Sequence, residues 1–172
     1  RDGHEMMPIN TVVNALHVRA LQCMTAIAGA LQRHDDVTTW QRRARRATRA
    51  LNKKLFHAQT GRYIDGEGST HSSLHANMFP LAFGLVPADR RAKVVAFVES
   101  RGMACSVYGA QYLLDGLYDT GAAEHALTLM DSPGDRGWWN MIEQGATMTM
   151  EAWGVRYKRN LDWNHAWGSA PL

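Results

Sequence analysis

The sequence predicts an all-α fold that is built as a succession of helical hairpins. Apolar residues recur at three- and four-residue steps along most of the chain, which is the period of an amphipathic helix. The connections between paired segments are short, and strands do not alternate with helices as they do in a parallel sheet. Such hairpins assemble into an open solenoid or a closed toroid, and periodicity alone leaves both arrangements possible.

The first expected hairpin joins two long helices. The first helix should begin after an N-cap at Asn10 or Thr11 and run to about His34, and the second should begin at Asp35. Their short connection requires an antiparallel pair. One face of the first helix carries its apolar residues: Val13, Leu16, Ala20, Met24, Ile27 and Leu31. The expected buried stripe of the second helix is Val37, Trp40, Ala44, Ala47, Leu51 and Leu55.

A small β excursion is expected between residues 57 and 70. Thr60-Gly61 and Asp65-Gly66 are turn signals, and they flank a possible short strand at Arg62-Tyr63-Ile64. Such a piece is typical of a connection between helices and does not make a sheet domain.

Four further helices are expected in the middle of the chain. The first covers Ser72–Gly84, and the second opens at Pro87 and Asp89 and should bury Val94, Phe97 and Val98. A third hairpin follows, with one helix around Val107–Leu117 and the next around Ala123–Met130. Gly102 and Gly121 fall between these elements, where the chain must turn.

Composition and charge argue against two classes of partner. The net charge is only +3, and no apolar run approaches the roughly 20 residues that a membrane span needs. The arginine-rich run at residues 42–49 is opposed by Asp35 and Asp36 and has no interleaved aromatic residues. This run indicates a solvated helix face, so neither a membrane nor a nucleic acid is expected as a partner.

No metal or other cofactor is expected. His71 and His75 are spaced to share a helix face, as metal ligands do, but Ser72 stands where a zinc-protease motif has glutamate. No third ligand is evident near them. Cys23 and Cys105 both lie among apolar residues, so we expect two buried thiols.

Both ends of the sequence look cut. The first five residues are polar and do not form a signal peptide, and the last residues stop where a further element should begin. We therefore expect a piece of a larger protein, and this leaves its compartment, cytoplasmic or secreted, open.

Residues 133–172 differ from the helical part because they are rich in tryptophan and glycine. Five of the six tryptophans lie there: Trp138, Trp139, Trp153, Trp163 and Trp167. Polar groups set among aromatic rings suit a sugar, whose apolar faces stack on the rings while its hydroxyls form hydrogen bonds.

Glu151 is the candidate catalytic residue in this region. It lies among apolar and small residues close to Trp153, and a carboxylate that loses water there tends to have a raised pKa. That suits a general base, although a helix cap or an ion pair with arginine is the structural alternative. His165 is a candidate for binding a sugar hydroxyl, or else a buried histidine satisfied by a backbone carbonyl.

Two segments resemble motifs of glycoside hydrolase family 78, the bacterial α-L-rhamnosidases. Segment 145–153, GATMTMEAW, is similar to the segment around the catalytic base of that family. Segment 161–168, LDWNHAWG, resembles the following motif, whose histidine contacts the bound sugar. Softer similarities at residues 10–15, 71–77 and 108–114 extend the resemblance over essentially the whole chain.

The resemblance implies a closed (α/α)6 toroid of six hairpins, with residues 1–172 as a single partial domain that forms its C-terminal half. It implies hydrolysis of terminal α-L-rhamnose from a rhamnose-containing glycoside with inversion, and it assigns the general base to Glu151. By the same resemblance, the residues that bind substrate are His165, Trp138, Trp139, Tyr108 and Trp153.

The general acid of that family comes from an upstream motif that has no match here. Asp2 and Glu5 lie near the start, but in the wrong context. We therefore expect no activity from the chain alone, and association with the remainder of a parent polypeptide or with itself, because a half-toroid exposes apolar edges. Two alternatives remain: another (α/α)6 glycosidase, and a non-catalytic helical-repeat or carbohydrate-binding fragment.

Overall fold

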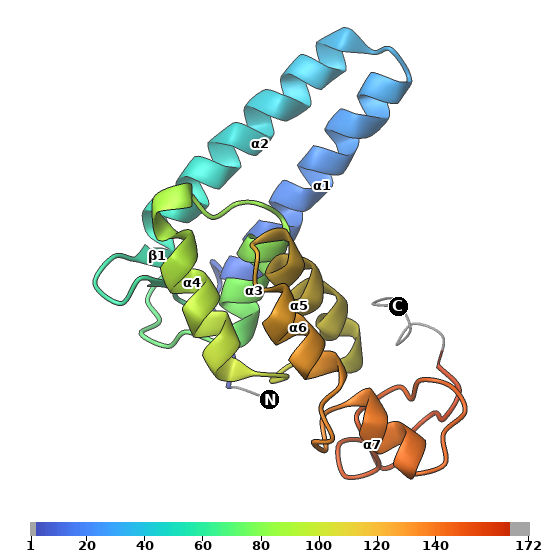
Figure 1. Cartoon of the computed structure of the whole chain (residues 1–172). Coiled ribbons are helices and arrows are strands. Elements are labelled where there is room, and N and C mark those ends of the chain that lie inside the picture. Colours follow the sequence, from blue (N-terminus) through green and yellow to red (C-terminus); the bar gives the residue numbers. More distant parts are fainter. Residues whose placement is uncertain (1–2, 166–172) are drawn as a thin grey trace.

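The computed structural model describes residues 3–165, and Figure 1 shows their arrangement. Within these residues there are seven helices and one two-stranded β hairpin. The helices are α1 (Thr11–Ala30), α2 (His34–Lys54), α3 (Leu74–Ala82), α4 (Ala88–Arg101), α5 (Val107–Asp119), α6 (Ala123–Met130) and α7 (Trp138–Glu143). The strands are β1 (Phe56–His57) and β2 (Arg62–Tyr63). The predicted succession of helices and the β excursion are both present.

Helices α1 and α2 form a long antiparallel hairpin that projects from the rest of the molecule (Figure 1). Asn10 is the N-cap of α1, as predicted, because its side-chain oxygen accepts a hydrogen bond from the Val13 amide at 3.1 Å. Helix α1 ends at Ala30, one turn before the predicted end at His34. His34 instead begins α2, whose first turn contains Asp35 and Asp36.

The apolar stripe of α1 does not face the core. Its five large members are between 40% and 64% exposed: Val13, Leu16, Met24, Ile27 and Leu31. The buried side of the same helix is formed by Thr11, Ala15, Val18, Leu21 and Ala28. At 100° per residue these two sets lie on opposite sides of the helix. Cys23 is also exposed, so the expectation of two buried thiols holds only for Cys105.

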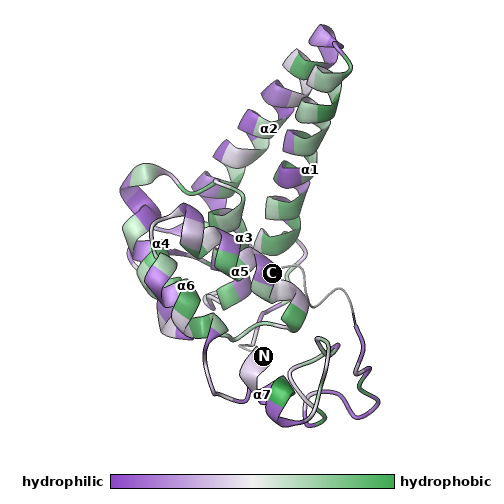
Figure 2. Ribbon diagram, turned by 45° about the vertical axis from the view of Figure 1, so that its right-hand side comes forward, coloured by the Kyte–Doolittle hydropathy of each residue, from purple (hydrophilic) through white to green (hydrophobic). Residues whose placement is uncertain are grey.

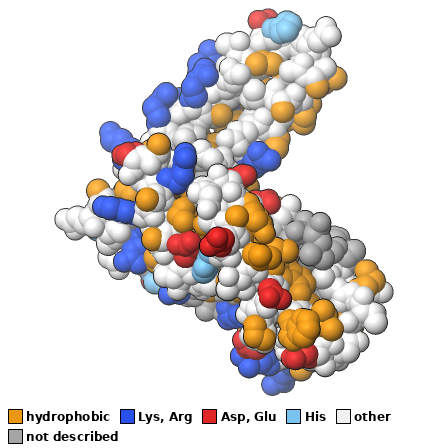
Figure 3. Space-filling model, viewed as in Figure 1, with side chains coloured by type: hydrophobic (Ala, Val, Ile, Leu, Met, Phe, Trp, Pro, Cys, Tyr) orange, Lys and Arg blue, Asp and Glu red, His pale blue; other side chains and the backbone are white. Residues whose placement is uncertain are grey.

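The expected buried stripe of α2 is correct only at its end. Leu51 and Leu55 are buried, whereas Val37, Trp40, Ala44 and Ala47 are half-buried. The outer part of α2 contacts α1 alone because the hairpin extends beyond the other helices. The basic residues of α2 face solvent as predicted, and Figure 3 shows them along one edge of the hairpin, with apolar side chains along the other.

Helix α3 is the centre of the core and contacts α1, α4 and α5. It begins at Leu74 because the Ser73 hydroxyl accepts a hydrogen bond from the Ala76 amide at 3.1 Å. His71 therefore precedes the helix, and the expectation that it shares a helix face with His75 is wrong. The main apolar core forms around α3 and includes Leu74, Met78, Val94, Val107, Leu113 and Leu117. Figure 2 colours the hydrophobic residues of these helices green.

The later helices follow the predictions closely, with one difference in burial. Val94 and Val98 of α4 are buried, but Phe97 is half-buried and its ring lies 4.8 Å from the Arg62 guanidinium. Leu127 of α6 is 60% exposed. Gly121 adopts a φ of 85° in the turn between α5 and α6, which explains the glycine there.

The β hairpin is fixed to α3 by one side chain. Strands β1 and β2 pair antiparallel, with Phe56 opposite Tyr63. The fully buried Asn77 side chain accepts from the Tyr63 amide at 2.8 Å and donates to the Tyr63 carbonyl at 3.0 Å. These bonds satisfy both backbone groups of Tyr63 and hold the excursion against the core.

Beyond α6, the chain forms a compact unit of loops around α7 (Figure 1). Two segments that are distant in sequence pair here: the Glu151 amide donates to the Asp162 carbonyl, and the His165 amide donates to the Thr149 carbonyl, both at 2.9 Å. This pairing brings Glu151 and His165 together. Residues 166–168 of the second motif lie outside the described residues.

Among residues 3–165, no helix is long and apolar enough to cross a membrane.

Candidate active site

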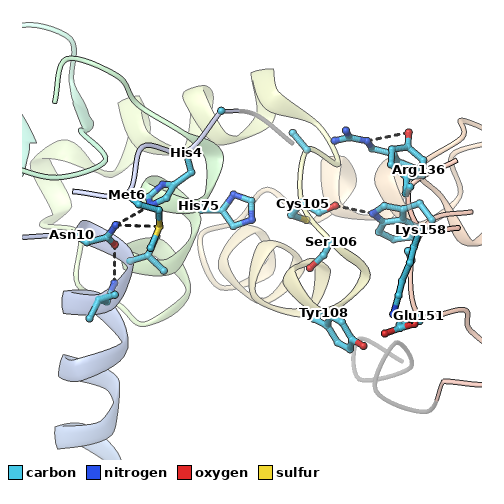
Figure 4. A pocket seen from close by; sticks show the side chains of 17 residues that line it. His4, Met6, Asn10, His75, Cys105, Ser106, Tyr108, Arg136, Glu151 and Lys158 are labelled. Carbon is cyan, nitrogen blue, oxygen red and sulfur yellow. Dashed lines mark hydrogen bonds and ion pairs between the residues drawn. The ribbon is translucent and has the colours of Figure 1, made fainter. Parts of the chain in front are cut away.

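A pocket of about 840 Å³ lies between the N-terminal segment and the C-terminal loops (Figure 4). One wall is formed by residues near the start of the chain and by His75 of α3. The opposite wall comes from the loops around α7, and the residues before and within the first turn of α5 lie between the two. The pocket is therefore built by segments that are distant in sequence.

The N-terminal wall is held by a buried carboxylate. Asp65 is fully buried and accepts hydrogen bonds from the amides of Glu5 at 2.8 Å and Ser73 at 2.7 Å and from His71 Nδ1 at 2.7 Å. Burial by itself raises the pKa of Asp65, but the hydrogen bonds from Ser73, Glu5 and His71 outweigh burial and leave the pKa below its usual value. The ionised carboxylate thus ties the N-terminal segment to the loop before α3.

His4 and Asn10 extend this network to the pocket surface. His4 Nδ1 lies 2.8 Å from the Ser73 hydroxyl oxygen and 3.4 Å from Asp65 Oδ1. The side-chain amide nitrogen Nδ2 of Asn10 lies 3.0 Å from His4 Nε2. In the neutral ring, Nδ1 therefore carries the proton and Nε2 accepts from Asn10. Both side chains line the pocket in fixed orientations.

Glu151 lies in the opposite wall and pairs with Lys158. The hydrogen bond with Lys158 lowers the pKa of Glu151 and outweighs partial burial, which acts in the opposite direction. The expectation that burial near a tryptophan raises this pKa is therefore wrong. Glu151 is ionised at neutral pH and can accept a proton.

Tyr108 and His165 meet beside Glu151. The Tyr108 hydroxyl lies 2.8 Å from His165 Nε2, and His165 Nδ1 lies 3.2 Å from a carboxylate oxygen of Asp162. Since the carboxylate only accepts, Nδ1 of the neutral ring carries the proton and Nε2 accepts from Tyr108. Burial raises the pKa of Tyr108, and the negative charge of Glu151 raises it further. Tyr108 lines the pocket, whereas His165 contacts the Tyr108 hydroxyl and is not among the lining residues, so its contact with a sugar stays a prediction.

The tryptophans near the pocket have different positions. Trp153 lines the pocket but is only 3% exposed, and its indole N–H donates to the Cys105 carbonyl at 2.7 Å. Trp138 stacks edge-on against Trp153 at 5.1 Å between centroids, and Trp139 is 49% exposed and donates to Glu143. Neither Trp138 nor Trp139 lines this pocket, so their role in binding the sugar stays a prediction.

The sequence interpretation missed two cations in the pocket, Lys158 and Arg136. Arg136 contacts the Tyr157 hydroxyl at 3.3 Å and the Met103 carbonyl at 3.4 Å. A sequence signal existed for Lys158, because it is the only lysine after Lys93 and follows Glu151 within the same tryptophan-rich region.

No group of three or more histidine, cysteine, aspartate or glutamate side chains within residues 3–165 is arranged to hold a metal ion. His71 is engaged by Asp65, and His75 lies on the pocket wall. Asp2, which lies near the start of the sequence in the wrong context for the general acid, is outside the described residues.

The family match and the similar solved structure both indicate an alpha-L-rhamnosidase fold. Over residues 1–172 the sequence matches the family described as the bacterial alpha-L-rhamnosidase six-hairpin glycosidase domain. The solved structure of an alpha-L-rhamnosidase from Dictyoglumus thermophilum is similar, with a TM-score of 0.68 and 24% identity, over 80% of this chain and 16% of that chain. No curated protein sequence matches the chain. These findings confirm the predicted all-α hairpin fold and favour a six-hairpin toroid over an open solenoid.

Proposed function

The chain belongs to the bacterial α-L-rhamnosidase six-hairpin glycosidase family, and on this premise we propose that it is part of a glycoside hydrolase that releases terminal α-L-rhamnose with inversion. The position of Glu151 carries the proposal. Its carboxylate lies in the wall of a pocket of about 840 Å³ that Tyr108 and Trp153 also line. The pKa of Glu151 is lowered and not raised as the sequence suggested, so the carboxylate is ionised and can accept a proton from water.

Inversion requires two carboxyl groups on opposite sides of the sugar. An acid protonates the leaving oxygen as the bond from that oxygen to the anomeric carbon breaks, while a base takes a proton from the water whose oxygen bonds to the same carbon. The two groups stand about 6.5–9.5 Å apart, which leaves room for the water. We assign the base to Glu151 and place the acid in a longer polypeptide.

We place the base in this chain and the acid in a longer polypeptide. The described residues that line the pocket support these assignments, because Glu151 is their only acidic member. Glu5 lies near the N-terminal wall but is not among the lining residues, and its carboxylate accepts a hydrogen bond from the Ser69 hydroxyl at 2.6 Å. We propose that Tyr108, Trp153 and His165 contact or support the bound sugar, and that Trp138 and Trp139 contribute aromatic surface once the domain is complete.

The experiment uses a longer polypeptide that contains this chain and an aryl α-L-rhamnoside as substrate. Glu151→Gln should lower kcat by about 10²–10⁴-fold, because the amide cannot accept the proton of water, while binding of rhamnose is largely retained. Glu124→Gln is the matched control, since Glu124 is an exposed carboxylate on α6, and it should leave kcat unchanged. An unchanged rate in Glu151→Gln would refute the base assignment.

Stereochemistry and specificity are tested with the same protein. Proton NMR during early turnover should show β-L-rhamnose as the first product from an α-linked substrate, and α-L-rhamnose would contradict inversion. A panel of aryl glycosides separates rhamnoside hydrolysis from the activity of another six-hairpin glycosidase. Failure of every glycoside to react, with sugar binding retained, would support a non-catalytic carbohydrate-binding fragment.

We further propose that residues 1–172 form the C-terminal half of the toroid and that its upstream hairpins pack on the exposed stripe of α1. The chain spans 16% of the length of the similar structure, which leaves more than enough chain for the remaining hairpins. The stripe runs along a helix of roughly 30 Å, and its five large apolar side chains are between 40% and 64% exposed.

The oligomeric state tests this packing. The chain alone should self-associate in analytical ultracentrifugation and should show no hydrolysis, and Leu16→Gln combined with Ile27→Gln should restore a monomer because both residues are exposed on the stripe. In the longer polypeptide the same double substitution should lower stability. A monomeric chain, with a longer polypeptide that tolerates the double substitution, would refute the packing.

A further inference from the structure

Lys158 is placed to control the carboxylate of Glu151. Its ammonium pairs with Oε2 of Glu151, and both side chains line the pocket (Figure 4). The side chain of Glu151 is 21% exposed and that of Lys158 is 37% exposed, so solvent screens this pair less than a fully exposed one. The contact leaves Oε1 of Glu151 outside the ion pair.

The loop between Glu151 and Lys158 is held by several hydrogen bonds, which fix the position of the Lys158 backbone. The Glu151 amide donates to the Asp162 carbonyl at 2.9 Å, and the Trp153 indole donates to the Cys105 carbonyl at 2.7 Å. The Tyr157 amide then closes a turn on the Gly154 carbonyl at 3.0 Å. Because these bonds hold the backbone of the loop, the ammonium of Lys158 lies beside the Glu151 carboxylate.

We propose that Lys158 is a positioning residue for Glu151: its ammonium holds Oε2 and so presents Oε1 to the water that attacks the sugar. This inference rests on the proposed role of Glu151 as the base. A cation at one oxygen limits rotation of the carboxylate and stabilises its ionised form. Lys158 itself transfers no proton in this scheme.

The other charged and titratable groups that face Glu151 come from two neighbouring elements. Asp162 and His165 lie on the segment that pairs with the loop, and Tyr108 lies on α5. A backbone hydrogen bond at Asp162 and the charge of His165 also lower the pKa of Glu151, but the hydrogen bond with Lys158 is the largest cause. Loss of the lysine should therefore raise this pKa and make the base protonate at higher pH.

The pH profile of kcat/KM distinguishes positioning from a merely structural role. In the longer polypeptide, Lys158→Met should move the acidic limb of the profile to higher pH, whereas Lys158→Arg should restore the wild-type limb because it keeps the cation. Arg159→Met is the matched control: Arg159 is the adjacent exposed cation, does not line the pocket, and should leave the profile unchanged. An acidic limb that stays in place in Lys158→Met, or an equal loss at every pH, would overturn the proposal.

A second measurement separates this proposal from the proposed function. Carbon-13 NMR titration of the Glu151 carboxyl in the chain needs no turnover, and Lys158→Met should raise its pKa while Lys158→Arg should not. If Glu151→Gln retains full activity, the base assignment fails even when this titration shows the expected shift. If Glu151→Gln is inactive but Lys158→Met does not move the titration, only the role of Lys158 fails.

Discussion

Asp65 offers the sharpest test of how the N-terminal wall of the pocket is held. We consider Asp65→Asn, which keeps the size of the side chain but replaces one acceptor oxygen by a donor group. Oδ2 accepts from the Glu5 amide at 2.8 Å and from His71 at 2.7 Å, and Oδ1 accepts from the Ser73 amide at 2.7 Å. An asparagine oriented in either direction leaves at least one of these donors facing another donor.

These contacts determine how much the substitution lowers the free energy of unfolding. An unsatisfied buried N–H costs about 1–3 kcal/mol, and each remaining bond weakens by about 1 kcal/mol when its acceptor becomes neutral. The best orientation of asparagine loses one bond and weakens two, so we expect a loss of about 3–5 kcal/mol in the free energy of unfolding at neutral pH. That is a large share of the roughly 5–15 kcal/mol that stabilises a typical domain.

The pH dependence of this loss has a definite sign. The pKa of Asp65 is lower in the folded chain than its unfolded value of about 3.9, so its ionised form stabilises the fold above that pH. This stabilisation disappears as the pH falls through the folded pKa. The difference between wild type and Asp65→Asn should therefore be largest at neutral pH and shrink in acid.

Urea denaturation of the chain at low protein concentration, at neutral and at acidic pH, measures both quantities. Asp131→Asn is the control, since Asp131 is exposed and should change stability by no more than about 0.5 kcal/mol. A loss below about 1 kcal/mol in Asp65→Asn at neutral pH, or a difference that does not shrink in acid, would refute the reasoning.

Three other substitutions test separate contacts. Asn77→Ala should destabilise the chain by about 2–4 kcal/mol in urea denaturation, because it leaves both backbone groups of Tyr63 without partners; a loss below about 0.5 kcal/mol would contradict this. Gly66→Ala would place a Cβ 2.4 Å from the Ile9 carbonyl oxygen, so hydrogen exchange should accelerate in residues 3–10, and unchanged protection would count against that contact. Trp153→Phe removes the indole donor from a buried carbonyl at 2.7 Å, so the melting temperature and kcat of the longer polypeptide should both fall, and unchanged values would show that the loop does not depend on this bond.

Local chemistry made the helices predictable. Asn10 caps α1 through its short side-chain oxygen, and Pro87 precedes α4 because its fixed φ suits the start of a helix. Gly102 and Gly121 mark turns with positive φ. Each of these signals depends on a few neighbouring residues, and a sequence displays such neighbours directly.

The buried face of α1 was not predictable from the same information. The apolar stripe identifies a helix face that avoids water, but it does not identify what covers that face. Within this chain α1 packs through Thr11, Ala15, Val18, Leu21 and Ala28 because α2 and α3 lie on that side. Long-range packing, and not periodicity, selects which face of α1 is buried here.

The candidate site was also predictable from the sequence only in part. The sequence by itself determined that residues 133–172 carry an aromatic, polar region with Glu151 and His165 as candidates, because motif and composition are local properties. Only the tertiary structure decided that Lys158 pairs with Glu151 and lowers its pKa, and that the opposite wall comes from His4 and Asn10. The electrostatic interaction between two side chains depends on their separation in space, which the distance along the chain does not give.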